Sequence, residues 1–301
     1  MTDATWRVLR DGAERELTGF GVGSPEAEAR WIIEQASGYR GSELVACIDE
    51  PASSIASNEV ARMLVERGGG APLQYVLGSW SFRGLDLYVD RRVLIPRPET
   101  EITAEHAIKE AVRVGARRGR PRPLVEAPQY TVVDLGTGSG AIALAMTVEL
   151  PEAEVWATDA SADALAVARA NLAGIGAAAT RVRLAEGDWF EAVPDELKRR
   201  VRVIVANPPY VATREIDDLP PEVARHEPID ALVSGPTGLE AITRIVDEAR
   251  AWLEPAGALV VEIAPHQAEV VAAAARSAGF VEVTVEPDLT GRDRVLVARV
   301  H

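Results

Sequence analysis

Hydrophobic residues recur at helical spacing over residues 5–70, and signals for helix ends interrupt the pattern. Ser24-Pro25 places a capping residue before a proline at the first helical position. Gly38 follows the same apolar run, and the glycine triplet at 68–70 ends the last of these helices. The pattern therefore predicts a small helical domain over residues 1–80.

A pattern with a period of two follows. Apolar and polar residues alternate in LDLYVD (85–90) and again in RRVLIP (91–96). Such alternation is typical of strands with one buried face. We therefore predict a β-hairpin linker over residues 81–97, which leads to a second domain over residues 98–301. Pro98 begins that domain as the first residue of a helix.

From Tyr130 onward, short runs rich in β-branched residues alternate with alanine-rich segments that are predicted to be helices near 140–149, 161–173 and 237–253. This alternation is typical of parallel strands joined by crossover helices. Two last runs, VEVTV and RVLVARV, leave no room for a helix between them, so the last strand is predicted to be antiparallel. The predicted fold class is α/β, a doubly wound Rossmann-like sheet preceded by a small all-helical domain. The five parallel strands are predicted at TVVDL, EVWATD, RVRLAEGD, RVIVANPPY and ALVVEI.

Composition narrows the classes of function. The 301 residues are 47% hydrophobic, which is enough for two domains, and the net charge of −14 disfavours binding to phosphate backbones. No apolar run reaches the roughly 18 residues of a membrane-spanning helix, so we expect a cytoplasmic protein that does not contact membranes. The arginine-rich stretch at 116–123 is interpreted as a solvated loop, with a contact to an acidic partner or RNA as the alternative.

Cysteine and histidine give no sign of a metal site. Cys47 is the single cysteine, which excludes an intrachain disulfide and a thiolate metal cluster. No pair of histidines has the spacing that brings two imidazoles to one helix face. We therefore expect no metal. The four histidines are His106, His226, His266 and His301.

A glycine-rich loop, GTGSG, follows the first predicted parallel strand and precedes a helix. Its glycines let the backbone turn sharply and approach a ligand. Asp159 ends the next strand, where a carboxylate can accept hydrogen bonds from both hydroxyls of a ribose. The sequence therefore predicts a nucleoside-cofactor site. Its residues are Gly136, Thr137, Gly138, Ser139, Gly140 and Asp159.

The loop alone does not decide which cofactor binds, because the same letters satisfy the G-x-G-x-x-A pattern of dinucleotide oxidoreductases. Asp134, two residues before the first glycine, favours the cationic amino end of S-adenosylmethionine over a pyrophosphate. Asp188 and Trp189 follow the third strand, where an adenine could receive a hydrogen bond and an aromatic contact. The alternative is that Trp189 packs on the edge of the sheet.

The fourth predicted strand ends at NPPY, on the same sheet edge as the glycine loop. The two prolines fix φ and remove two N–H donors, which leaves a rigid corner rich in carbonyl groups. The Asn207 side-chain oxygen and the Pro208 carbonyl can each accept one hydrogen of a planar NH2 group, and Tyr210 can stack on its plane. This corner selects an amide or an exocyclic base amine, and a structural turn is the alternative interpretation.

These motifs together resemble a known family. NPPY after GTGSG is similar to amino-nitrogen methyltransferases that use S-adenosylmethionine, and longer segments resemble the release-factor glutamine methyltransferases, called PrmC or HemK. The sequence departs from that family at Ala264, where glycine is usual. The matching segments are PLQYVLGSWSFRGLDLYVDRRVLIPRPETE (72–101), VVDLGTGSGAIALA (132–145), EGDWF (186–190), NPPYVATREIDDLPPEV with RHEP (207–228) and DLTGRDRVLVAR (288–299).

The resemblance implies methyl transfer from S-adenosyl-L-methionine to the side-chain amide nitrogen (N5) of the glutamine in the Gly-Gly-Gln motif of class I peptide chain release factors. It implies that the glycine loop lines the cofactor, with Asp159 at the ribose, Trp189 near the adenine and Asn207 close to both ligands. A monomer without direct contact to nucleic acid is expected. The residues expected to hold the glutamine are Asn207, Pro208, Pro209 and Tyr210, with Asn207, Pro208 and Tyr210 as catalytic residues.

Other functions remain open at this point. An adenine N6-methyltransferase acting on nucleic acid shares the NPPY chemistry, although it should have a basic recognition surface. An NAD-dependent oxidoreductase fits the glycine loop but leaves NPPY unexplained, and a non-enzymatic adaptor leaves the acceptor corner without a purpose. Glutamine methylation of ribosomal protein L3 is the nearest enzymatic alternative.

Overall fold

The computed structural model describes residues 4–117 and 128–301, which form two compact units. The first unit comprises the residues up to Ser79 together with Pro220–His226. The second comprises Trp80–Leu219 and Glu227–His301. The chain therefore leaves the second unit after Leu219, contributes a short segment to the first unit and re-enters the second at Glu227.

The first unit is built from helices whose apolar faces surround Leu17, Ile32 and Met63. The second helix begins at Pro25 and ends before Gly38, which adopts the left-handed conformation with φ of 77°. The predicted helical N-terminal region is confirmed. The helices of this unit are α1 (Trp6–Gly19), α2 (Pro25–Ser37), α3 (Ser42–Ala46), α4 (Ser54–Gly68), α5 (Leu73–Leu77) and α9 (Pro221–His226).

The β-hairpin lies earlier in the chain than the sequence predicts. β1 (Ser79–Phe82) pairs with β2 (Leu85–Tyr88), and the turn between them is Arg83-Gly84. Both turn residues have positive φ, 47° and 76°, as a tight two-residue hairpin turn requires. The alternation in LDLYVD therefore belongs to the second strand of the hairpin and not to the first.

The strand predicted at 91–96 is wrong. Asp90 does begin a turn, since its side chain accepts a hydrogen bond from the backbone N–H of Arg92 at 3.0 Å. Beyond the turn, the Ile95 N–H donates to the Glu227 carboxylate at 3.2 Å and not to the backbone of a neighbouring strand. Pro96 then removes the next N–H from any ladder.

The second unit contains a seven-stranded sheet with the order β5-β4-β3-β6-β7-β9-β8. Strands β3 to β7 are parallel, whereas β9 lies between β7 and β8 and runs antiparallel to both. This confirms the predicted doubly wound α/β fold with an antiparallel last strand. The strands are β3 (Tyr130–Leu135), β4 (Ala153–Asp159), β5 (Val182–Glu186), β6 (Val201–Ala206), β7 (Leu253–Glu262), β8 (Glu282–Pro287) and β9 (Asp293–Arg299).

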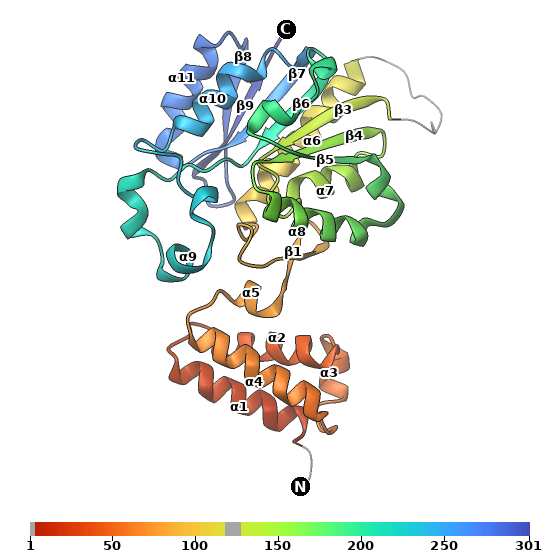
Figure 1. Ribbon diagram of the computed structural model, residues 1–301, viewed down its shortest axis with the longest axis vertical. Helices are drawn as coiled ribbons and strands as arrows, with labels where there is room; N and C mark the ends of the chain where they lie inside the picture. Colours follow the sequence, from red (N-terminus) through yellow and green to blue (C-terminus); the bar gives the residue numbers. More distant parts are fainter. Residues whose placement is uncertain (1–3, 118–127) are drawn as a thin grey trace. The chain divides into compact units, whose positions relative to one another are not determined.

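Helices cover both faces of this sheet (Figure 1). Successive strand residues point to opposite faces, so Val132 packs with α6 and α7 while Val133 packs with α10 and α11. The sequence pattern did not predict α11. The helices are α6 (Pro98–Arg117), α7 (Ala141–Glu149), α8 (Ala162–Leu172), α10 (Glu240–Ala249) and α11 (Ala268–Ser277), with short 3-10 segments η1 (Ala173–Arg181), η2 (Trp189–Ala192), η3 (Asp195–Leu197), η4 (Thr213–Asp218), η5 (Ile229–Ala231) and η6 (Pro265–Gln267).

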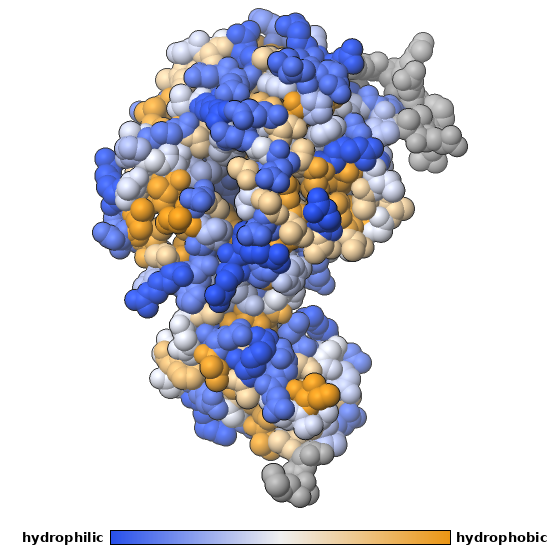
Figure 2. Space-filling view, in the orientation of Figure 1, coloured by the Kyte–Doolittle hydropathy of each residue, from blue (hydrophilic) through white to orange (hydrophobic). Residues whose placement is uncertain are grey.

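The visible surface is mostly hydrophilic, with apolar side chains in small groups (Figure 2). Among the described residues, no helix has both the length and the apolar character needed to cross a bilayer. Most of the arginine-rich stretch interpreted as a solvated loop, residues 118–123, lies outside the described part of the chain.

Candidate functional site

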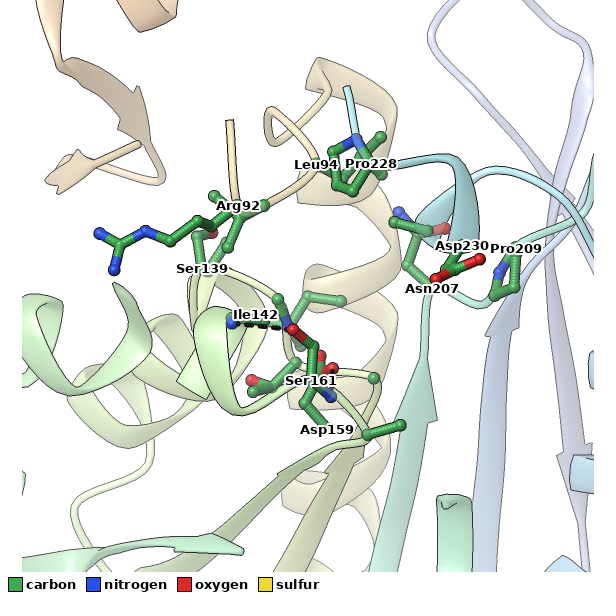
Figure 3. A pocket seen from close by; sticks show the side chains of 18 of the residues that line it. Arg92, Leu94, Ser139, Ile142, Asp159, Ser161, Asn207, Pro209, Pro228 and Asp230 are labelled. Atoms are coloured by element: carbon green, nitrogen blue, oxygen red, sulfur yellow. Dashed lines mark hydrogen bonds between the residues drawn. The ribbon is translucent and has the colours of Figure 1, made fainter. Parts of the chain in front are cut away.

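A cavity of about 460 Å³ lies at the carboxyl ends of the parallel strands. Residues that follow β3, β4, β5 and β6 all line it, at the sheet edge where α/β folds bind their ligands. Asn207 and Pro209 lie across the cavity from Ser139 and Asp159 (Figure 3). The predicted site residues that line it are Gly136, Thr137, Gly138, Ser139, Asp159, Asp188, Trp189, Asn207 and Pro209.

Three predicted site residues, all within the described part of the chain, do not line this cavity: Gly140, Pro208 and Tyr210. Gly140 instead allows close helix packing, since a Cβ there would lie 3.3 Å from Leu144 and 3.4 Å from Ala168. Tyr210 packs against the hydrophobic cluster under α10 and α11.

The glycine loop turns sharply from β3 into α7. Gly136, Gly138 and Gly140 have φ of 69°, 56° and 86°, the left-handed region that favours glycine. The Thr137 N–H donates to the Thr158 carbonyl at 2.8 Å, which ties the loop to β4. A Cβ on Gly138 would meet no atom within 4 Å, so the backbone at this point is open to a ligand.

Asp134 lies directly beneath the loop and is almost completely buried. Its Oδ2 accepts hydrogen bonds from the Thr137 hydroxyl at 2.6 Å and from the Ala143 N–H at 3.1 Å. Among the described residues, nothing hydrogen-bonds its buried Oδ1. Burial raises the pKa of Asp134 to about 7, and the nearby Asp159 adds to the shift. A cation bound near the loop would therefore favour the charged form of this carboxyl group.

The Asp159 carboxylate also organises the loop backbone. It accepts hydrogen bonds from the Gly138 N–H at 2.8 Å and from the Ser161 N–H at 2.9 Å. Burial raises the pKa of Asp159, and these backbone donors oppose that rise. Asp159 also lines the cavity, so one side chain both shapes the loop and faces the ligand space.

Asp188 and Trp189 form the wall of the cavity beyond β5. The Asp188 carboxylate pairs with the Arg244 guanidinium, which reaches it from α10 and also contacts Glu191 at 3.0 Å. Trp189 has φ of 50°, and its ring lies 3.3 Å from where a Cβ on Gly136 would stand. An indole therefore covers one end of the glycine loop.

Asn207 follows β6, and only one end of its side-chain amide has a hydrogen-bond partner. Its Nδ2 donates to the Thr100 hydroxyl at 3.2 Å. Its Oδ1 is buried, and no described residue donates a hydrogen bond to it. A buried acceptor without a donor costs free energy, on the order of 1 to 3 kcal/mol, unless a ligand supplies the donor. The site therefore offers an acceptor for an N–H group.

Hydrogen bonds from the Gln267 side chain hold the backbone that follows Asn207. The Gln267 side chain donates to the Tyr210 carbonyl at 3.1 Å and to the Gly238 carbonyl at 2.9 Å. It also accepts from the Ala264 N–H at 3.1 Å. Ala264, the position at which the sequence departs from the pattern of the family it resembles, has φ of −74°, which alanine adopts without strain. Burial raises the pKa of the Tyr210 hydroxyl to about 12, so it stays protonated.

Sequence reasoning missed several residues that support the site. Thr100 and Thr103 interrupt the apolar face of α6 three residues apart, and this spacing was a signal that they share a polar partner. That partner, Glu262, is buried at the end of β7. Arg244 and Asn171 gave no local signal, because each meets the site only through the fold. Asn171 donates to the Ser139 carbonyl at 2.9 Å.

Comparison of the sequence with known proteins finds two matching family models and relatives of nearly full length. The family model described as methyltransferase small domain matches residues 122–223, and the PrmC N-terminal domain matches residues 9–78. The release factor glutamine methyltransferase of Deinococcus radiodurans is 38% identical over 97% of this chain and 98% of its own length. The protein of the same name from Bordetella pertussis is 40% identical over 91% of this chain and 94% of its own length.

A solved structure shares the fold. The hMettl16 catalytic domain, in complex with the MAT2A 3'UTR hairpin 6, is 15% identical, with a TM-score of 0.53 over 81% of this chain and 81% of that chain. At this level of identity the similarity concerns the architecture alone.

Proposed function

Because the chain belongs to the family of release factor glutamine methyltransferases, we propose that it methylates the side-chain amide nitrogen of the glutamine in the Gly-Gly-Gln motif of class I peptide chain release factors, with S-adenosylmethionine as methyl donor. Release factors work in translation, so we expect the protein to act in the cytoplasm. We also expect it to act as a monomer without direct contact to nucleic acid.

One observation supports the substrate class best. Asn207 lines the cavity together with Pro209, and its buried Oδ1 has no hydrogen-bond donor among the described residues. An amide NH2 group supplies the missing donor, while the prolines at 208 and 209 leave carbonyl groups without competing N–H donors. A primary amide therefore fits this corner.

The residues of the cavity also fit the proposed cofactor. The open backbone at Gly138 accommodates close approach, and the carboxylate of Asp159 can accept from ribose hydroxyls. The Asp134 Oδ1 has no hydrogen-bond donor among the described residues, and a cationic ligand bound at the loop would favour the charged form of this carboxyl group. When bound, S-adenosylmethionine supplies an electrophilic methyl group attached to a positively charged sulfur.

The protein's own contribution is mainly positioning. The lone pair of an amide nitrogen is delocalised into the carbonyl, so the nitrogen is a weak nucleophile and its orientation matters. Holding two reactants in an attack geometry supplies roughly 7 to 11 kcal/mol. Asn207 Oδ1, by accepting an N–H of the substrate, favours the positive charge that develops on nitrogen. The proton can leave after transfer because a protonated N-alkyl amide is strongly acidic.

Methylation of purified release factor tests the proposal. The protein is incubated with a class I release factor and S-adenosylmethionine labelled in its methyl group, and peptides are sequenced by mass spectrometry. We expect label on the glutamine of the Gly-Gly-Gln motif. A release factor in which that glutamine is replaced by asparagine is the matched control and should remain unlabelled.

The same assay includes the other substrate classes. Ribosomal protein L3, DNA and RNA are offered in parallel under the same conditions. Label in any of these, with none in the release factor, would assign the protein a different substrate.

A further inference from the structure

A buried carboxyl group lies behind the NPPY corner. Glu262 is the last residue of β7 and is only 1% exposed. Ala206 of β6 pairs with Val261 of β7, so Asn207 and Glu262 are the next residues along two neighbouring strands. A carboxylate this deeply buried needs hydrogen-bond donors to remain charged.

Two hydroxyl groups of α6 provide donors. The Thr103 hydroxyl donates to Glu262 Oε2 at 3.1 Å. The Thr100 side chain also lies close enough to the same carboxyl group to favour its charged form. Both threonines are almost fully buried, and Thr100 also lines the cavity.

The contacts of Thr100 determine in which direction its hydroxyl group donates a hydrogen bond. Its oxygen accepts the Asn207 Nδ2–H at 3.2 Å, which leaves the hydroxyl proton free to point elsewhere. The Glu262 carboxylate is placed to receive that proton, since the Thr100 side chain favours its charged form. The bonds therefore run from the Asn207 amide through the Thr100 hydroxyl to the Glu262 carboxylate.

This direction distinguishes the two orientations of the Asn207 amide. With its proton directed at Glu262, Thr100 offers Asn207 only a lone pair, and only the NH2 end of the amide can use it. The Oδ1 end is then left in the buried position without a partner. The opposite orientation would present N–H donors to a substrate NH2 group, which is itself a donor.

We propose that Glu262 and Thr100 are positioning residues that hold the Asn207 amide with its oxygen facing the substrate nitrogen. Neither residue needs to touch the reacting atoms. The role in turnover rests on the proposed function, whereas the orientation of the amide is a property of the free protein.

We call the contacts from Asn207 through Thr100 to Glu262 the relay. The charge state of Glu262 decides in which direction the hydrogen bonds of the relay run. Burial raises the pKa of Glu262 to about 7, and Thr100 and Thr103 oppose that rise. Among the described residues, the charged or titratable groups that act on it are Glu99 from α6, Tyr210 after β6 and Arg294 from β9. A protonated Glu262 can donate to Thr100, which frees the threonine proton for the Asn207 oxygen. Turnover should therefore rise as pH increases through about 7.

Single-turnover kinetics test the relay in catalysis. Thr100→Val should slow methyl transfer about tenfold or more while changing the cofactor Kd less than about threefold, and Thr100→Ser should restore most of the rate. Thr147→Val is the matched control, because Thr147 is a similarly buried threonine whose hydroxyl donates to the Ala143 carbonyl within α7. Glu262→Gln should flatten the rise in rate between pH 6 and 8.

A double-mutant cycle separates positioning from general damage. In an Asn207→Ala background, Thr100→Val should cause no further loss of rate, since Thr100 acts through Asn207. Rate losses that multiply in the double variant would overturn the relay, as would a Thr100→Val enzyme that turns over like the parent.

Nuclear magnetic resonance tests the orientation without a substrate. The Asn207 side-chain NH2 signals, assigned by their loss in Asn207→Asp, should titrate with a midpoint near pH 7 in the parent and in Thr147→Val. They should not titrate in Glu262→Gln or Thr100→Val. Titration that is unchanged in these two variants refutes the relay. Failure of the parent to methylate a release factor refutes the proposed function and leaves this readout decisive for the relay.

Discussion

The carboxylate of Asp159 accepts a hydrogen bond from the backbone N–H of Gly138 at 2.8 Å. The residue predicted to hold a ribose therefore also fixes the loop predicted to cradle the cofactor. Each oxygen still has lone-pair capacity for a further donor, since a carboxylate offers about four acceptor sites. This double role makes the position sensitive to loss of charge.

Asp159→Asn should weaken S-adenosylmethionine binding by about 1.5 to 3 kcal/mol, the range for hydrogen bonds to a charged group. Calorimetry of the folded variant measures the change. Asp163→Asn is the control, because Asp163 is an exposed carboxylate in the first turn of α8. Equal affinity in parent and Asp159→Asn, or binding of NAD by the parent, would refute the cofactor role.

Asn207→Ala should reduce methyl transfer roughly 100- to 1000-fold, by analogy with loss of one preorganised oxyanion-hole donor. The variant loses the acceptor for the substrate N–H while the folded backbone remains. Single-turnover assays on a release factor, with the folded fraction measured by thermal melting, separate rate from stability. A loss below about tenfold per folded molecule contradicts a catalytic role.

Asn207→Asp adds a complementary test. Aspartate keeps the size and an acceptor oxygen but loses the N–H that Thr100 accepts. The variant should therefore also be slow, although it still has an oxygen near the substrate. Full activity in Asn207→Asp would show that the amide nitrogen plays no part.

Arg244→Met should weaken cofactor binding only two- to fivefold. Arg244 pairs with Asp188 from a partly exposed position, and such ion pairs contribute about 0.2 to 1 kcal/mol. The same calorimetry measures this effect, with Arg250→Met as a control from the end of the same helix. The effect should shrink at high salt, because partly exposed charge pairs are screened. A salt-independent loss points to packing rather than charge.

Glu262→Gln should change how stability depends on pH. The folded-state pKa of Glu262, about 7, is above its ordinary value of 4.5, so the carboxyl favours folding when protonated. The parent's free energy of unfolding should fall, relative to the variant, as pH rises from about 4.5 to 7, by about 2 to 3 kcal/mol. Urea unfolding at pH 5 and pH 8 measures the difference. A pH-independent difference between the two proteins contradicts the shift.

The sequence predicted the parallel sheet and the glycine loop well because both depend on local patterns. Runs of β-branched residues identify buried strands, and the glycines identify a turn that other residues adopt only with strain. The hairpin was misplaced because alternation appears on both sides of Asp90. The actual turn at Arg83-Gly84 and the hydrogen bond from the Ile95 backbone N–H to the Glu227 carboxylate decide the pairing.

The supporting residues of the site were harder to predict. Arg244 meets Asp188 across 56 residues of chain, and Thr100 meets Asn207 across 107. Contacts at such separation depend on how helices pack on the sheet, which residue patterns do not encode. The place of Asn207 at the cavity was predictable because its motif directly follows a predicted strand of the parallel sheet.

Pro220–His226 belongs to the first unit although it is far from the rest of that unit in the sequence. This restricts which segments can be exchanged between this protein and its relatives. The Glu222 carboxylate of α9 lies 3.6 Å from the Arg67 guanidinium of α4. The helical unit is therefore assembled from two separated stretches of the sequence. A chimera that takes only the N-terminal stretch from a relative combines the helices of that relative with the α9 of this protein. Exchange of the helical unit between relatives should therefore succeed only when both stretches are inherited together.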